Sequence, residues 1–412
     1  MPGDGSIRTQ IGTLVVATSL VQLANGFFGT LVSLRVAIEH FDAPGLVLSA
    51  YFGGFTLGAL GCGRVIERIG HIRAYAAFAG VVAVATTMMP LLIGSLAWTA
   101  LRTMIGFGCA GIFVTTESWL TAKALPDERG RAFSMYMVGT FLALAIGQLL
   151  IARADVKASA PFNVIVALLA VALVMVSTAR TEPPPSSATA LLRYGVLTKA
   201  APVAVVGCGL SGMVSGAFYA LVPAWMQDQG TDRETIALFM LVAVLGGLAF
   251  QIPVGRFSDR FDRRIVLALL CFGFAGTAFV MIHLPRSVAA MLPAASLLGG
   301  FMSTLYPVCV AHAHDRMPAD RVLAVSGRLI LVSGVGSVLG PLIGASLMAH
   351  LEIDGVFYFM ASAVLVLAFV ASLGSFVTAP SAPMRQPFEL LTPQAGPLAH
   401  DPFGHQQLNG LK

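Results

Sequence analysis

Two copies of one short motif reveal how this chain is organised. Residues 63–68, Gly-Arg-Val-Ile-Glu-Arg, end one apolar run, and residues 255–260, Gly-Arg-Phe-Ser-Asp-Arg, end another one 192 residues later. At the same offset, residues 126–134, Pro-Asp-Glu-Arg-Gly-Arg-Ala-Phe-Ser, match residues 318–326, Pro-Ala-Asp-Arg-Val-Leu-Ala-Val-Ser. Two matches at one offset are much less likely to arise by chance than one. They predict a chain of two duplicated halves.

Around these motifs the chain is strongly apolar. Of its 412 residues, 57% are hydrophobic and only 11% are charged, whereas soluble domains contain roughly 25% charged residues. The surface of a large soluble protein must stay mostly polar, so this composition excludes a soluble enzyme. The net charge of +5 is spread in short clusters between apolar runs, which argues against a nucleic-acid partner and for a lipid bilayer.

Apolar runs of about 20 residues, broken by charged or turn residues, predict an all-α polytopic membrane protein with twelve transmembrane helices. The spans are expected at 11–34, 45–63, 74–94, 96–122, 132–152, 161–179, 200–226, 235–256, 265–284, 288–312, 322–348 and 354–378. The duplication divides them into two six-helix pseudo-repeats, 1–180 and 200–378. A Pro- and Ser-rich cytoplasmic linker at 181–199 joins the halves, and the tail at 379–412 is expected to be disordered.

Basic residues predict the orientation of these spans. With twelve spans both termini lie on one side, and that side collects 18 of the 25 Lys and Arg residues, against 5 on the other. The positive-inside rule therefore places both termini in the cytoplasm. The five cysteines all lie in or beside apolar spans without paired spacing, so we expect buried thiols rather than disulfides or metal ligands.

Three groups of residues resemble the signatures of the major facilitator superfamily of secondary transporters. They are Gly63, Glu67, Arg68, Gly70 and Arg73 after the second span, Gly255, Asp259, Arg260, Arg263 and Arg264 after the eighth, and Arg102, Gly106 and Gly108 in the fourth. Glu67 stands where the family usually has Asp. The Gly-Pro-x-x-Gly string typical of the fifth span in drug antiporters occurs instead in the eleventh, at 340–344.

The resemblance covers all twelve spans and implies a transporter of a small organic solute that works by alternating access. It implies the fold of that superfamily, proton coupling, a lean towards export, a monomer in a bacterial inner membrane, and neither cofactor nor metal. A solute-uptake symporter and an uncoupled facilitator or channel remain as alternatives.

Three ionisable residues inside the spans are candidates for substrate binding or proton coupling, because charge within a bilayer is costly. Arg102 resembles the family's fourth-span arginine, implicated in proton coupling or anion binding; alternatively it reaches the outer interface. Glu117 either carries the coupling proton or forms a structural relay with loop arginines near the cytoplasmic mouth. Arg328 either belongs to the inner charge cluster or contacts the substrate.

A cavity is expected at the membrane midplane between the halves. Uncharged polar residues in the spans are candidates for its lining, or alternatively hydrogen-bond across helix interfaces. They are Gln22, Asn25, Gln148, Ser211, Ser215, Tyr219, Gln251 and Tyr306. The two loop motifs are predicted to form a cytoplasmic gate, with Glu67 and Asp259 docking on the inner N-termini of spans eleven and five.

One hypothesis from a different class is a rhomboid-like intramembrane protease. The string Gly-Leu-Ser-Gly at 209–212 resembles the serine motif of those proteases, and His283 lies two spans later. The duplicated loops have no place in that fold, so this reading is kept only as a remote alternative.

Overall fold

We describe a computed structural model of the chain, covering residues 4–123, 129–178, 194–285, 287–318 and 321–377. Every regular element in these ranges is helical. The N-terminal half contains α1 (Asp4–Ile38), α2 (Pro44–Ile69), α3 (His71–Met88), α4 (Ser95–Lys123), α5 (Arg129–Gln148) with the 3₁₀ turn η2 (Leu149–Arg153), and α6 (Ala160–Thr178). The C-terminal half contains the short α7 (Tyr194–Ala200), then α8 (Pro202–Asp228), α9 (Arg233–Arg260), α10 (Arg263–His283), α11 (Val288–His314), α12 (Val322–His350) and α13 (Gly355–Val377).

Twelve of these helices are long and apolar enough to cross a bilayer, which confirms the predicted number of spans. Large apolar side chains such as Leu57, Phe272 and Phe369 are exposed around the bundle, as expected for a surface that faces lipid. The five cysteines are free and buried, as predicted. The predicted tail and most of the linker lie outside the described residues, and residues 194–199 of the linker belong to α7.

One boundary difference lies between the third and fourth spans. The sequence predicts an apolar span up to residue 94, but α3 ends at Met88 and a turn leads to α4 at Ser95. The buried Trp98 indole donates to the Met89 carbonyl oxygen at 2.9 Å, which ties this turn to the first turn of α4. An apolar run does not show where a helix ends when its loop is itself apolar, as at Leu91 and Leu92.

Glycines allow α2 and α4 to pack closely in the N-terminal half. A side chain at Gly54 would collide with the Thr103 backbone, and one at Gly106 would collide with the Tyr51 carbonyl oxygen. The two helices therefore cross at backbone contact, as small residues permit in membrane helix pairs. This crossing places Tyr51 of α2 and Arg102 of α4 near each other, within reach of the space between the halves.

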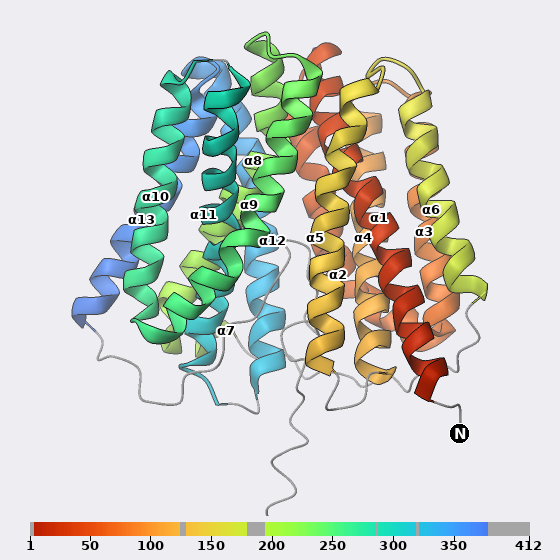
Figure 1. The fold of residues 1–412 in the computed structure, drawn as a ribbon, viewed down its shortest axis with the longest axis horizontal. Coiled ribbons are helices and arrows are strands. Elements are labelled where there is room, and N and C mark those ends of the chain that lie inside the picture. The colour runs from red at the N-terminus through yellow and green to blue at the C-terminus, as the bar shows by residue number, and fades with distance from the viewer. Residues whose placement is uncertain (1–3, 124–128, 179–193, 286, 319–320, 378–412) are drawn as a thin grey trace, which may run out of the picture.

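Helices of the two halves pack against one another: α1 packs on α8, α2 on α12, and α5 with η2 on α9 (Figure 1). Hydrogen bonds between described residues join them, from Ser33 Oγ to the Ala220 carbonyl (2.6 Å), Ser49 Oγ to the Val338 carbonyl (2.7 Å), and Arg233 Nη1 to the Ala154 carbonyl (2.8 Å). The donors lie near helix ends, with Ser33 near the end of α1, Ser49 near the start of α2 and Arg233 at the start of α9, all on the side away from the N-terminus of the chain. The halves are thus fastened together at the end opposite the N-terminus.

Candidate functional site: a cavity between the halves

A large cavity lies between the two halves. It encloses about 1480 Å³, counted together with its open mouth, and α1, α2, α4, α5, α8, α11 and α12 all contribute to its wall. Small-molecule sites are concave and mostly apolar, with a few polar groups that orient the ligand, and this wall has that character. Its lining combines apolar residues such as Phe52, Phe55 and Met302 with polar side chains from both halves.

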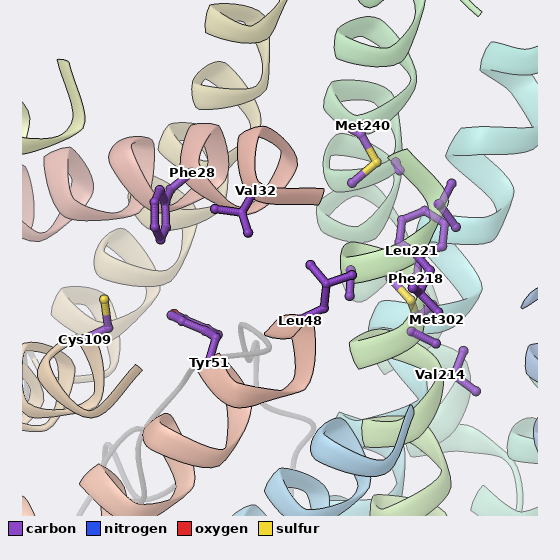
Figure 2. Packing of buried hydrophobic residues seen from close by; sticks show 14 of the residues in the cluster. Phe28, Val32, Leu48, Tyr51, Cys109, Val214, Phe218, Leu221, Met240 and Met302 are labelled. Carbon is purple, nitrogen blue, oxygen red and sulfur yellow. The ribbon is translucent and has the colours of Figure 1, made fainter. Parts of the chain in front are cut away.

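Among the described residues that line the cavity, Arg102 is the one that carries a charge. It lies on the third turn of α4, is 4% exposed, and its guanidinium carbon lies 5.4 Å from the Phe28 ring centre and 4.9 Å from the Tyr51 ring centre. Figure 2 shows these two rings, from α1 and α2, facing a common space. The Arg102 Nε is buried without a hydrogen-bond partner, and no described carboxylate pairs with this side chain. Two aromatic faces thus stabilise a buried cation that has no counter-ion.

Amide side chains surround the same region of the N-terminal half. Asn25 Nδ2 donates to Gln22 Oε1 at 3.2 Å and to the Tyr51 hydroxyl at 3.1 Å. On the other side of α1, Thr30 Oγ1 donates to Gln148 Oε1 of α5 at 2.6 Å. These bonds hold the helices α1, α2 and α5 around the space that Arg102 faces.

The C-terminal half supplies hydroxyl groups instead of charge. Ser337 Oγ donates to the Ser333 carbonyl one turn earlier, and Ser215 does the same to Ser211. The Tyr219 hydroxyl and Ser303 Oγ are buried in the lining without a hydrogen-bond partner. Of the described residues that line the cavity, none is Asp or Glu. The wall is therefore cationic on one side and neutral on the other.

The structure brings seven of the predicted candidates to the cavity wall: Gln22, Asn25, Arg102, Gln148, Ser215, Tyr219 and Tyr306. It places the other four elsewhere. Glu117 is buried in α4, where its Oε1 accepts a 3.4 Å hydrogen bond from the Tyr136 hydroxyl. Ser211 bonds to the Cys208 carbonyl within α8, Gln251 is buried in α9, and Arg328 lies half-buried on α12.

Other lining residues were not singled out from the sequence. They are the hydroxyl residues Thr30, Thr56, Ser303, Ser333 and Ser337, and Tyr51 with the apolar residues around it. Ser and Thr in helices commonly bond to the carbonyl one turn back, so their presence in a span carries no information about the face they occupy. Tyr51 lies within an apolar run, where a tyrosine gives no sign of which face of the helix it occupies.

The two copies of the predicted cytoplasmic gate differ in the exposure and ion pairing of their charged residues. Glu67, Arg68 and Arg73 are exposed and form no ion pair with a described residue. The docking of Glu67 on the inner N-terminus of span eleven is not made in this structure, because α2 and α12 meet at their opposite ends. In the second copy Arg263 is buried and binds Asp315 (2.6 Å) and Asp259 (3.3 Å).

Comparison with known proteins identifies this architecture. The sequence model of the Major Facilitator Superfamily matches residues 14–204 and 204–403. An uncharacterised MFS-type transporter, YcaD of Escherichia fergusonii, is 32% identical over 348 residues, which cover 83% of this chain and 90% of the relative.

Two solved transporters share the fold. The nucleoside transporter NupG has a TM-score of 0.71 at 12% identity, over 90% of this chain and 100% of its own. A D-xylose–proton symporter has a TM-score of 0.67 at 16% identity, over 90% and 98%. The intramembrane-protease alternative is therefore wrong: Ser211 belongs to a packed transporter helix, where its hydroxyl donates to a backbone carbonyl. The chain is a member of the major facilitator superfamily, an integral membrane transporter and not an enzyme.

Proposed function

We propose that this protein is a secondary active transporter that moves a small organic solute through the central cavity by alternating access. The observation that carries the proposal is a cavity walled by both halves and fastened at one end by contacts of α1 with α8 and of α2 with α12. A rocking motion that breaks these contacts would open that end. The opposite end would then close on the two loop motifs.

The proposed orientation follows from the distribution of basic residues. If the arginine-rich loops face the cytoplasm of a bacterial cell, both termini lie inside and the described conformation is open to the cytoplasm. Reporter fusions test this arrangement: a fusion near Ser159 should report the outer side, and one near Ser187 the inner side. The reverse pattern would overturn the orientation.

Proton coupling and export form the finer part of the proposal. A structural neighbour is described as a proton symporter, and Glu117 is a buried carboxyl group bonded to the Tyr136 hydroxyl within the span that carries Arg102. Inverted vesicles with an acidic lumen and a pH-sensitive dye test both features with a panel of amines, organic acids, sugars and drug-like compounds. Collapse of the gradient by a compound in vesicles with the wild-type protein, but not in vesicles with Arg102→Ala, supports proton-coupled export. Saturable movement that follows the solute gradient alone supports a facilitator.

Alternating access itself is testable without a known solute. In a variant without the five native cysteines, Ser49→Cys and Val338→Cys are joined by a short thiol cross-linker, and Ser215→Cys in the cavity reports access to a membrane-impermeant maleimide. We expect labelling from one face of the membrane when the cross-link is present and from both faces without it. The matched control is a cross-link of Thr18→Cys with Thr116→Cys, which are hydrogen-bonded (3.0 Å) within one half.

The control cross-link should leave labelling from both faces intact. Labelling from both faces in the Ser49–Val338 cross-linked protein would instead indicate a channel, and would overturn alternating access.

A further inference from the structure

We infer that the transported solute is an organic anion, whose carboxylate or similarly charged group binds Arg102. The inference rests on the proposed transport function and names the substrate class of the same cavity. Arg102 is 4% exposed, its guanidinium group lies over the aromatic rings of Phe28 and Tyr51, and its Nε has no hydrogen-bond partner among the described residues. A guanidinium group always carries its charge and has five N–H donors, so a cavity that holds one without a counter-ion is incomplete.

The chemistry of the guanidinium selects the missing partner. Its planar arrangement of donors matches the two oxygens of a carboxylate, or the oxygens of a phosphate or sulfonate, better than any neutral acceptor. The aromatic contacts cannot fill this role, since a ring face offers no hydrogen-bond acceptor comparable to an anionic oxygen. The neighbouring amides of Gln22 and Asn25 are already bonded to each other.

The opposite wall indicates what the rest of the solute contains. The Tyr219 hydroxyl of α8 and Ser303 Oγ of α11 are buried, line the same cavity and lack a hydrogen-bond partner. Phe52, Phe55 and Met302 supply an apolar surface in the same lining. An anion with an apolar body and a second polar group would therefore contact both halves at once, which lets its binding favour one conformation over the other.

The lining also excludes the opposite charge. A cationic amine would enter a space that already holds Arg102 and in which none of the described lining residues is a carboxylate. The described wall offers such an amine aromatic faces and neutral oxygens but no negative charge, and the positive charge of Arg102 repels it. The cavity is thus complementary to anions and unfavourable for cations.

Two cysteine reagents of similar size and opposite charge test this selectivity. Ser215→Cys, in the variant without native cysteines, is treated from the open side with 2-sulfonatoethyl or 2-(trimethylammonium)ethyl methanethiosulfonate. Each rate is divided by the rate of that reagent with free 2-mercaptoethanol. We expect the anionic reagent to react at least ten-fold faster after this correction. Arg102→Gln should abolish the preference, and Arg102→Lys should retain most of it because the charge remains.

The matched control is Arg35→Gln, which removes a buried arginine outside the cavity that binds Glu39 (2.6 Å) and the Val156 carbonyl (2.8 Å). It should keep the preference for the anionic reagent. Equal rates, faster reaction of the cation, or a preference that survives Arg102→Gln would overturn the inference. Should Arg102→Gln fail to fold, the ratio of anionic to cationic reaction rates in the wild-type background and in Arg102→Lys still tests whether the cavity prefers anions. Labelling of the Ser49–Val338 cross-linked protein tests alternating access, whereas the ratio of the two reagent rates tests anion selectivity. A failure of the transport mechanism is therefore distinguishable from a failure of anion selectivity.

Discussion

The two copies of the loop motif, at residues 63–73 and 255–265, share sequence and position in the topology. They differ in the burial and ion pairing of their charged side chains. In the second copy Arg263 is 2% exposed and binds Asp315, itself 4% exposed, at 2.6 Å. In the first copy Glu67, Arg68 and Arg73 are exposed. Duplication thus preserved the motif, while the second copy became part of the folded core of its half and the first remained available for another contact.

Three substitutions account for the difference. At the offset of 192 residues, Asp315 corresponds to Lys123 and Arg263 to His71, so the first half lacks both members of the buried ion pair. Asp262 corresponds to Gly70. Gly70 has a φ of 82° in the link between α2 and α3, whereas Asp262 caps α10 by accepting from the Arg264 amide at 2.9 Å. The second link is therefore held by an ion pair and a side-chain cap, whereas the first combines the positive φ of Gly70 with a 3.0 Å hydrogen bond between His71 Nε2 and Ser118 Oγ.

Breaking the buried ion pair should have the largest effect on stability. Arg263→Gln leaves Asp315 buried without its partner, and removal of one member of a buried pair costs about 3–5 kcal/mol. Thermal unfolding of the purified protein measures this loss. The control in the first copy, Arg68→Gln, alters an exposed arginine and should change the free energy of unfolding by less than about 0.5 kcal/mol. Equal losses in the two variants would remove the distinction between the copies.

Replacement of Gly70 should have the next largest effect. Gly70→Ala forces a side chain into a backbone conformation with positive φ, which costs about 1–3 kcal/mol. Gly63→Ala is the control within the same motif, since Gly63 lies in α2 with open space around it and alanine favours helix by up to about 1 kcal/mol. Thermal unfolding should rank Gly63→Ala above wild type and Gly70→Ala below it. A neutral Gly70→Ala would mean that the first link is not held by its backbone.

Loss of the α10 cap should cost less and depend on pH. Asp262→Ala removes a cap worth about 0.5–2 kcal/mol. Hydrogen bonds from Arg264 hold the pKa of Asp262 below its usual value, so this carboxylate stabilises the fold above the usual carboxylate range and loses that effect as pH falls through its lowered pKa. The stability difference between wild type and variant should therefore shrink from pH 7 to pH 3. A difference that is constant with pH would show that the charge of Asp262 does not matter.

Neutral replacements at the predicted cytoplasmic gate should change the conformational balance, and Glu67→Gln should have the smallest effect on stability; Asp259→Asn also removes the 3.3 Å ion pair with Arg263, which keeps its pair with Asp315. Glu67→Gln and Asp259→Asn remove charges predicted to dock on helix N-termini when the inner end closes. Such contacts are worth about 0.3–1 kcal/mol, or roughly a two- to five-fold change in population. Labelling of Ser215→Cys from the two faces measures that change. Unchanged labelling ratios and unchanged transport in both variants would show that the predicted cytoplasmic gate plays no part in the mechanism.

The helices and the duplication were readable from the chain because each depends on local composition or on direct repetition. Twelve apolar runs predict twelve spans, and the repeated motifs predict the two halves. Helix ends were less accurate: α2 extends to Ile69 and α9 to Arg260, past the predicted ends at 63 and 256. Charged residues end an apolar run but not a helix, since the last turns of a membrane helix commonly extend into the headgroup region.

The sequence by itself determined the number of spans, the internal repeat and the presence of an arginine within the fourth span. Only the tertiary structure decided that Arg102 faces the cavity while Glu117 and Gln251 do not. The physical reason is that lipid and protein interior are equally apolar. A membrane helix therefore carries little amphipathic signal for its rotation, and packing contacts such as the Gly54–Thr103 approach determine which of its faces lines the cavity.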